Sequence, residues 1–205
     1  IHDFQHGQTD ILIGTQMVSK GLDFEHVSVV GILDADSMMN FPDFRSHERA
    51  FPLMAQVAGR AGRKPRQGLV VLQTRSKDAS VIHHVVANDY AALYDDQLAE
   101  RMLFRYPPYY RLVYIYLKHR DAGLVDTLAA EMATRLRTVF GTRILGPDAP
   151  PVARVQTFFI RKIILKVETA ASLAKVRHEL LAIRHEMLTD PRFRSCIIHF
   201  DVDPC

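Results

Sequence analysis

The first third of the chain alternates short apolar runs with a helical stretch. Each run has the length of a strand buried on both faces, as in a parallel sheet, and the runs are residues 10–14, 27–33 and 68–73. Residues 44–58 have the apolar spacing of an amphipathic helix. Because Pro52 removes a backbone donor inside this stretch, we expect a kink or two abutting helices. Strands that alternate with helices predict a βαβ layout, with the first strands of the sheet before Ile1.

The middle of the chain is helical and ends in a proline pair. Residues 78–104 predict two helices broken near Asn88 and Asp89. The segment Tyr106-Pro-Pro-Tyr-Tyr110 follows, and Pro-Pro cannot continue a helix. We therefore predict a sheet domain over residues 1–76, a helical connector over 77–105 and a second domain over 106–205.

The second domain has strand and helix periodicities in the order βαββαβ. Strands are predicted at residues 112–117, 143–146, 157–167 and 195–202, and helices at 121–140 and 172–188. In the first of these helices, apolar residues recur every fourth position at Leu124, Leu128, Met132 and Leu136. This order is typical of a small split-βαβ fold with ferredoxin-like topology. The overall expectation is an α/β lobe with a parallel sheet, followed by a small α+β domain.

Composition narrows the class of protein. The chain has 205 residues and is 48% hydrophobic, but it contains no run of eighteen apolar residues that could span a membrane. Two cysteines, Cys196 and Cys205, exclude a disulfide framework or a four-cysteine zinc site and fit a reducing cytoplasm. The adjacent His83 and His84 point about 100° apart on a helix, which favours two solvated histidines over a metal-binding pair. The chain begins without a signal peptide or initiator methionine, so we expect a fragment.

Positive charge is concentrated in the second half. Residues 101–166 carry 12 Lys/Arg against 4 Asp/Glu, although the net charge of the whole chain is only +3. A basic segment interleaved with aromatic residues indicates contact with nucleic acid or, alternatively, a solvated charged surface. Tyr106, Tyr109 and Tyr110 could likewise stack on bases or pack one domain against the other.

The clearest chemical motif is Gln56-Val-Ala-Gly59-Arg60-Ala-Gly62-Arg63. It presents two guanidinium groups three residues apart, on one side of a helix or tight turn, beside glycines that let the backbone approach closely. Guanidinium groups suit phosphate oxygens, and in phosphoryl transfer they stabilise the charge that spreads over the γ-phosphate. The alternative is a structural role in capping carbonyls at a helix end.

A second motif lies 35 to 45 residues earlier and follows the predicted strand at residues 10–14. It contains Gly14-Thr15-Gln16, Lys20-Gly21 and Asp23. Ligands bind open α/β sheets at the carboxyl ends of the strands, where backbone N–H groups and hydroxyls can hold phosphates. Asp23 could orient an arginine or contact a ribose. Asp34 and Asp36 also end a strand near the same edge, either for a function there or simply to end the strand.

In order and spacing these two motifs resemble motifs V and VI of superfamily 2 helicases. The resemblance then sharpens to the PriA family (primosomal protein N′). It rests on the segments Asp10–Met17, Leu33–Asp36, Pro42–Arg49 and Gln56–Arg63, on Tyr106-Pro-Pro, on Leu145-Gly-Pro147 and on the closing Asp201-Val-Asp-Pro204. The match runs along the whole chain, and the marks in the second half distinguish this family from another superfamily 2 motor such as an RNA helicase.

The resemblance implies an ATP-dependent 3′-to-5′ DNA helicase of the bacterial cytoplasm that recognises stalled or abandoned replication forks and directs primosome assembly. Its implied partners are forked and single-stranded DNA, single-stranded-DNA-binding protein and other primosome proteins, without a membrane. Arg60 and Arg63 would be arginine fingers and Gln56 a nucleotide contact, with Gly21, Asp23 and Gly59 in the ATP cleft. Thr15, Gln16 and Lys20 would contact the DNA strand or support the cleft.

The family's phosphate-binding lysine loop, metal motif and cysteine-rich zinc insertion have no counterpart in this sequence. ATP and Mg²⁺ are therefore expected to be bound by the complete protein and zinc only by its upstream part, and this chain alone is expected neither to hydrolyse ATP nor to bind a metal.

In the second domain, Arg161 and Lys162 are the candidate DNA contacts. Phe158, Ile160 and Lys162 stand where the family has more arginine and a glutamine. A domain that docks proteins without touching DNA is the alternative. Asp201 and Asp203, two apart on a strand, could bind a cation or be solvated carboxylates at the chain end.

Overall fold

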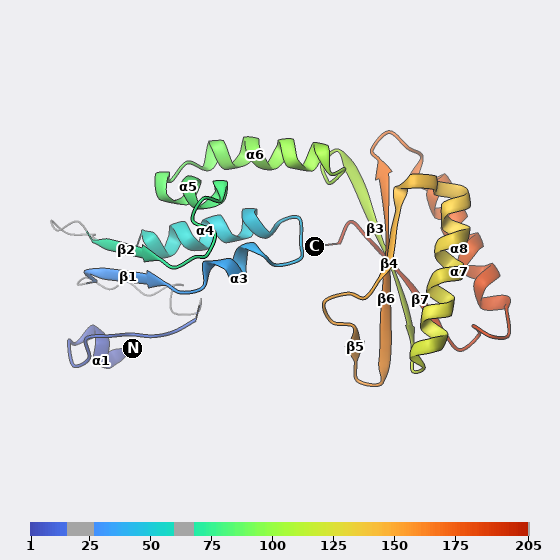
Figure 1. Cartoon of the computed structure of the whole chain (residues 1–205), viewed down its shortest axis with the longest axis horizontal. Helices are drawn as coiled ribbons and strands as arrows, with labels where there is room; N and C mark the ends of the chain where they lie inside the picture. The colour runs from blue at the N-terminus through green and yellow to red at the C-terminus, as the bar shows by residue number, and fades with distance from the viewer. Residues whose placement is uncertain (16–26, 60–67, 205) are drawn as a thin grey trace. The chain divides into compact units, whose positions relative to one another are not determined.

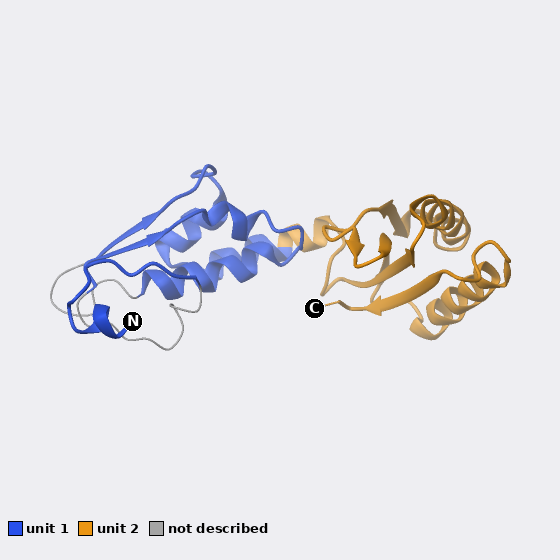
Figure 2. Cartoon of the chain, turned by 90° about the horizontal axis from the view of Figure 1, so that it is seen from below, with its two compact units in different colours: residues 1–98 blue, residues 99–205 orange. Residues whose placement is uncertain are grey.

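The structure is a computed structural model, and it describes residues 1–15, 27–59 and 68–204. The chain divides into two compact units, residues 1–98 and 99–205, which Figure 2 shows in blue and orange. The division falls inside one helix, α6 (Tyr90–Leu103). The predicted boundaries at residues 76 and 105 lie on either side of it and remain predictions.

Unit 1 is built around two parallel strands and several helices. Its elements are α1 (His2–Gln5), β1 (Val29–Ile32), α3 (Ala35–Met39), α4 (Ser46–Ala58), β2 (Leu69–Leu72), α5 (Ser80–Ala87) and the first part of α6. Strands β1 and β2 pair in parallel, with Val29 opposite Leu69 and Ile32 opposite Leu72. The core lies between the strands and helices α3 to α6, and its fully buried side chains include Met54, Val81 and Leu93.

The predicted parallel strands at residues 27–33 and 68–73 are confirmed, but their burial on both faces is wrong. One sheet face is exposed, since Val29 and Leu69 are each 58% exposed and Val71 is 50% exposed. The strand predicted at residues 10–14 is also wrong, because residues 11–15 have no regular structure and Ile13 is 87% exposed. An apolar run becomes a strand only where a neighbouring strand pairs with its backbone groups.

The helices of unit 1 follow the predicted pattern more closely. The break near residue 88 is confirmed, since α5 ends at Ala87, the following Asn88 has a left-handed φ of 52°, and α6 begins at Tyr90. Asparagine tolerates this conformation better than most residues. Helix α4 is a single helix that continues through Pro52, so the two abutting helices are not found. Its buried face carries Ala50, Phe51 and Met54.

Unit 2 is a five-stranded antiparallel sheet with two helices. Its elements are β3 (Tyr110–His119), α7 (Ala122–Phe140), the 3₁₀ turn η1 (Gly141–Arg143), β4 (Ile144–Asp148), β5 (Arg154–Val155), β6 (Phe158–Glu168), α8 (Leu173–Thr189) and β7 (Ile197–Val202). The strand order is β4-β6-β3-β7, with the short β5 paired to β6. This is the ferredoxin-like order predicted from the βαββαβ pattern.

Helices α7 and α8 lie side by side on one face of this sheet (Figure 1). Both begin with a side-chain cap: Asp121 accepts from the Leu124 N–H, and Ser172 accepts from the Lys175 N–H. The predicted stripe of α7 is confirmed, since Leu128, Met132 and Leu136 are fully buried. The fold class is thus an α/β unit with a parallel sheet, followed by a separate small α+β unit. In the described residues, no helix is long and apolar enough to cross a membrane.

Candidate functional site

The carboxyl ends of β1 and β2 are tied together by Asp36. Its carboxylate accepts from the Arg75 N–H at 2.7 Å and from the Thr74 hydroxyl at 3.0 Å. The Arg75 backbone N–H, followed by smaller contributions that include the Thr74 hydroxyl, lowers the pKa of Asp36 below its ordinary value. Beside it, Asp34 has a left-handed φ of 53° and precedes α3. These contacts give Asp36 a structural role in joining the two strand ends, whereas the two roles left open by the sequence, a function at this edge or ending the strand, stay predictions.

The arginine motif begins at the end of α4. Gln56 is exposed in the last turn, and Gly59 follows the helix as its C-cap. Thr15 is exposed as well. The remaining predicted residues of the nucleotide and DNA site in unit 1 lie outside the described residues; they are Gln16, Lys20, Gly21, Asp23, Arg60 and Arg63. Their assigned roles stay predictions.

The two DNA contacts predicted in unit 2 lie on opposite faces of the sheet. Successive residues of a strand point to opposite sides. Arg161 points to the helix side, where its Nε pairs with the Asp126 carboxylate of α7 at 2.5 Å. Lys162 points to the other side, where its ammonium lies 4.7 Å from the centroid of the Tyr114 ring. One phosphate therefore cannot engage both side chains.

We call the side that bears Lys162 the open sheet face and define it by Tyr114, Tyr116, Lys118, Phe158 and Lys162. The register places Tyr116 directly opposite Lys162 and Lys118 opposite Ile160. The Tyr114 and Tyr116 rings meet edge to face, with centroids 6.2 Å apart. Burial, and secondarily the charge of Asp201, raises the pKa of Tyr116 above its usual value, so its hydroxyl stays neutral.

At one end of the same side, Lys166 fastens the start of the unit to the sheet. Its ammonium donates to the Phe104 carbonyl at 2.6 Å and lies 3.7 Å from the Tyr106 ring centroid. Burial, and then the charge of Arg105, lowers the pKa of Lys166. Tyr106 thus contacts a residue of its own unit, and its two possible roles, base stacking and packing of one domain against the other, stay predictions.

Two of the family-like marks have structural reasons. Gly146 has a φ of +90°, and a Cβ there would lie 2.9 Å from the Lys162 carbonyl oxygen, so only glycine fits. Asp203 has a φ of 50°, and its carboxylate accepts from the Leu112 N–H at 3.3 Å and from Arg111 at 3.0 Å. These contacts bind the chain end to the start of β3.

The candidate metal ligands do not form a site. The Asp203 carboxylate is engaged as described, and His84 lies 2.8 Å from the Asp96 carboxylate. No group of three histidines, cysteines or carboxylates in the described residues could hold a metal ion.

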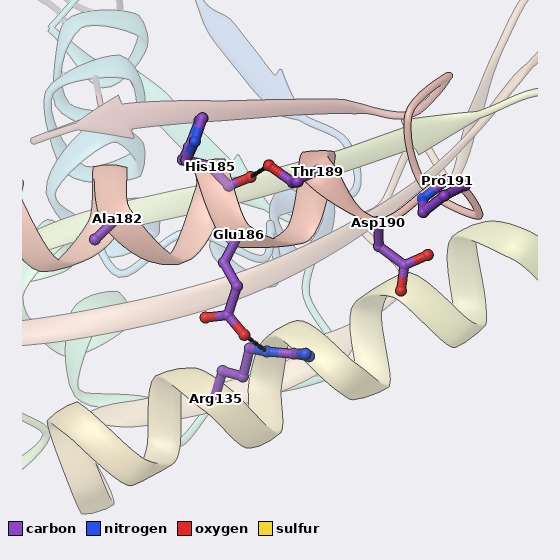
Figure 3. A pocket seen from close by; sticks show the side chains of 7 residues that line it. All are labelled: Arg135, Ala182, His185, Glu186, Thr189, Asp190 and Pro191. Carbon is purple, nitrogen blue, oxygen red and sulfur yellow. Dashed lines mark hydrogen bonds and ion pairs between the residues drawn. The ribbon is translucent and has the colours of Figure 1, made fainter.

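A groove of about 740 Å³ runs between α7 and α8 (Figure 3). Its polar side chains are largely engaged with each other: Arg135 donates to Glu186 at 2.9 Å, and the Thr189 hydroxyl donates to the His185 carbonyl. Asp190 at its edge pairs with Arg192 at 2.7 Å. A smaller cavity of about 500 Å³ lies beside the Arg143–Glu168 ion pair. Neither cavity is lined by a residue that defines the open sheet face.

Both units of the chain match known protein families. Residues 1–65 match the family of the helicase conserved C-terminal domain, and residues 102–205 match the family described as the primosomal protein N C-terminal domain. The second match covers just over half of the chain. The chain belongs to the PriA family of primosomal proteins.

Relatives within the PriA family agree over nearly the whole chain. The replication restart protein PriA of Bacillus subtilis is 38% identical over 180 residues, 87% of this chain and 22% of that protein. The PriA of Haemophilus influenzae is 32% identical over 206 residues, 100% of this chain and 28% of that protein. The chain thus spans between a fifth and three tenths of the length of these relatives. The recognition made from the motifs is confirmed.

Sequence reasoning missed the role of Lys166 in the PriA-type unit. In the sequence it was one of several cations in a basic segment. Its signal was present, however, because Lys166 stands between Leu165 and Val167 at the end of a long apolar strand. Lysines are almost never fully buried unless they are paired, and this one is 7% exposed.

Proposed function

We propose that this chain is the C-terminal part of an ATP-dependent DNA helicase that moves 3′ to 5′, recognises stalled or abandoned replication forks and directs primosome assembly. The observation that carries the proposal is the order of the two family matches on one chain. A helicase C-terminal region would supply half of a motor, and a primosomal domain follows it further along the same chain. The name of the relatives, replication restart protein PriA, supports the same role.

In this proposal, Arg60 and Arg63 stabilise the charge that develops on the γ-phosphate, and Gln56 contacts the nucleotide. The exposure of Gln56 in the last turn of α4 leaves it accessible to a nucleotide. Gly21, Asp23 and Gly59 complete the cleft, and Thr15, Gln16 and Lys20 contact the DNA strand. ATP and Mg²⁺ are bound by the complete protein, in which residues outside this chain supply the phosphate-binding loop and the metal motif, and zinc is bound only by the upstream part.

Unit 2 would hold forked or single-stranded DNA and contact single-stranded-DNA-binding protein and other primosome proteins. Its concentration of positive charge supports contact with a polyanion. Since these partners are those of a replication protein, we propose that the complete protein works in the bacterial cytoplasm.

The test uses the complete protein and strand separation of a partial duplex. Wild type should unwind a duplex with a 3′ single-stranded overhang in the presence of ATP, and not one with a 5′ overhang. Changing Arg63 to Ala should reduce unwinding and ATP hydrolysis by about a thousandfold or more, because an arginine finger contributes roughly 10³–10⁵ in rate. The control is Arg75→Ala. The hydrogen bond from Arg75 to Asp36 comes from the backbone N–H, which alanine keeps. ATP hydrolysis by the Arg63→Ala protein at the wild-type rate would refute the assignment.

A second assay concerns the 205-residue chain by itself. Since the phosphate-binding loop is expected elsewhere, this chain should release no phosphate from ATP with or without DNA. DNA-stimulated phosphate release by the isolated chain would contradict the proposed division of the motor.

A further inference from the structure

The open sheet face of unit 2 combines aromatic rings with cations on the two central strands. Tyr114 and Tyr116 lie on β3, and Phe158 and Lys162 lie on β6. All four are partly exposed. Helices α7 and α8 cover the opposite face (Figure 1). The buried side chains of the core of unit 2 come from these helices and from that face of the sheet. The strand residues on the open side therefore serve no helix packing within this unit.

The pairing of ring and cation repeats along this face. Lys162 lies over the Tyr114 ring, and the Arg120 guanidinium lies 5.5 Å from the Phe158 ring centroid. Lys118 extends the same line, since the register places it beside Ile160 and Ile197. A ring offers a stacking surface and the neighbouring cation offers a partner for a phosphate. A repeated pair of aromatic ring and cation matches a nucleic-acid strand, in which each nucleotide carries one base and one phosphate.

The shape of the face selects among ligands. Neither of the two cavities described above is lined by a residue that defines the open sheet face, and neighbouring strands form this face, so we expect a ligand here to lie along the strands. In a duplex the flat sides of the bases are stacked on one another and unavailable, whereas in a single strand they can stack on protein aromatics. Four-stranded sheets with aromatics on the central strands bind single strands in this way.

Charge on the face is mixed but favours an anion. Its cations are Lys118, Arg120 and Lys162, and His199 lies opposite Tyr116. Two carboxylates face the same side by register, Asp201 opposite Tyr114 and Asp148 opposite Lys162. Both lie toward the edge strands, so the central line of rings and cations runs between them and fixes the path of the ligand.

We propose that the open sheet face binds single-stranded DNA, with bases stacked on Tyr114, Tyr116 and Phe158 and phosphates held by Lys118, Arg120 and Lys162. The choice of DNA over RNA rests on the proposed function. This site uses Lys162 from the predicted pair and leaves Arg161 in its ion pair with Asp126.

The experiment measures anisotropy of a fluorescent oligodeoxythymidylate of about 12 nucleotides, titrated with the 205-residue chain at two salt concentrations. Changing Tyr116 to Leu keeps an apolar side chain but removes the ring, and should weaken binding about five- to a hundredfold. Changing Lys162 to Gln should weaken binding and also flatten its salt dependence, because one counterion fewer is released. Oligouridylate in parallel tests the choice of DNA, and equal or tighter binding of the RNA would overturn that choice.

The matched controls are Arg177→Gln, an exposed cation on the helix side, and Tyr94→Leu, an exposed tyrosine of unit 1. Both should bind as wild type, and thermal melting should show every variant folded. Ultraviolet cross-linking locates the strand independently, with adducts expected in the peptides of β3 and β6. Unchanged binding by the Tyr116 and Lys162 variants, or adducts confined to other peptides, would overturn the inference. Neither result bears on Arg63, so the motor proposal is tested separately.

Discussion

The sheet of residues 99–205 and the sheet of residues 1–98 have very different surroundings. In unit 2 the central strands β3 and β6 have hydrogen-bonded neighbours on both sides and two long helices on one face. In unit 1 each described strand pairs with one neighbour, and the sheet face of Val29, Leu69 and Val71 is exposed. Unit 2 therefore carries most of its own stabilisation, whereas unit 1 leaves apolar surface that another protein segment could cover.

The largest expected difference is in backbone protection. Amides of β3 and β6 should exchange with solvent at least about a hundredfold more slowly than those of β1 and β2, because strands in a buried central position open less often. Hydrogen exchange of the 205-residue chain, read by mass spectrometry, measures this ratio. Equal protection in the two sheets would show that unit 1 is as self-sufficient as unit 2.

The next test is a methyl group added to unit 2. Changing Gly146 to Ala strains a backbone at φ +90° and brings the new carbon to 2.9 Å from the Lys162 carbonyl oxygen. We expect a loss of about 2–4 kcal/mol in the stability of unit 2, measured by urea unfolding followed by circular dichroism. Gly31→Ala in β1 is the control, since no atom lies within 4 Å of its added carbon. A Gly146→Ala protein as stable as wild type would contradict the described backbone conformation at Gly146 and its close contact with the Lys162 carbonyl.

A smaller effect is expected at the buried lysine. Changing Lys166 to Met removes the donor to the Phe104 carbonyl and the charge beside the Tyr106 ring. The loss should be about 1–3 kcal/mol, because the Phe104 carbonyl loses a hydrogen bond from a charged donor, and amide exchange at residues 104–110 should increase. The control is Lys175→Met at the exposed start of α8. If the two changes lowered the free energy of urea unfolding equally, the contacts of Lys166 with Phe104 and Tyr106 would not be stabilising as described.

The smallest expected effect is on the stability of the two units at acidic pH, and we expect it to be similar in both. Hydrogen bonds hold the pKa of Asp36 in unit 1 and of Glu168 in unit 2 below their ordinary 3.8 and 4.5. Since the folded pKa is the lower one, their stabilisation is present above these values and is lost as pH falls through the folded pKa. In the variants Asp36→Asn and Glu168→Gln, the free energy of unfolding should fall less between pH 6 and pH 3 than it does in wild type. Thermal melting at a series of pH values measures this difference. An unchanged pH dependence in both variants would contradict the described hydrogen bonds.

Patterns whose cause is local were predicted well. The break at Asn88, helices α7 and α8 and the βαββαβ succession of unit 2 all follow from residues close in sequence. The strand expected at residues 10–14 fails because strand formation depends on a distant partner, which an apolar run does not specify. The short β5 was also missed, since two residues carry no periodicity.

The candidate site shows the same limit. The arginine motif, and with it the family, could be recognised from a few fixed positions. The separation of Arg161 and Lys162 by the sheet could also have been predicted, because neighbouring residues of a strand point to opposite faces and residues 157–167 were expected to form a strand. Tyr114 and Tyr116 were seen only as strand formers, because their shared face with Lys162 depends on the pairing of β3 with β6.

The central claim is a division of labour, in which unit 1 carries part of the motor chemistry and unit 2 holds DNA. Its most direct test is ATP hydrolysis by the complete protein, measured across a range of single-stranded DNA concentrations. Arg63→Ala should abolish the maximal rate and leave the DNA affinity within a few fold, whereas Lys162→Gln should raise the DNA concentration for half-maximal rate and leave the maximal rate unchanged. A full maximal rate for Arg63→Ala, or a lowered maximal rate with unchanged DNA dependence for Lys162→Gln, would contradict this division.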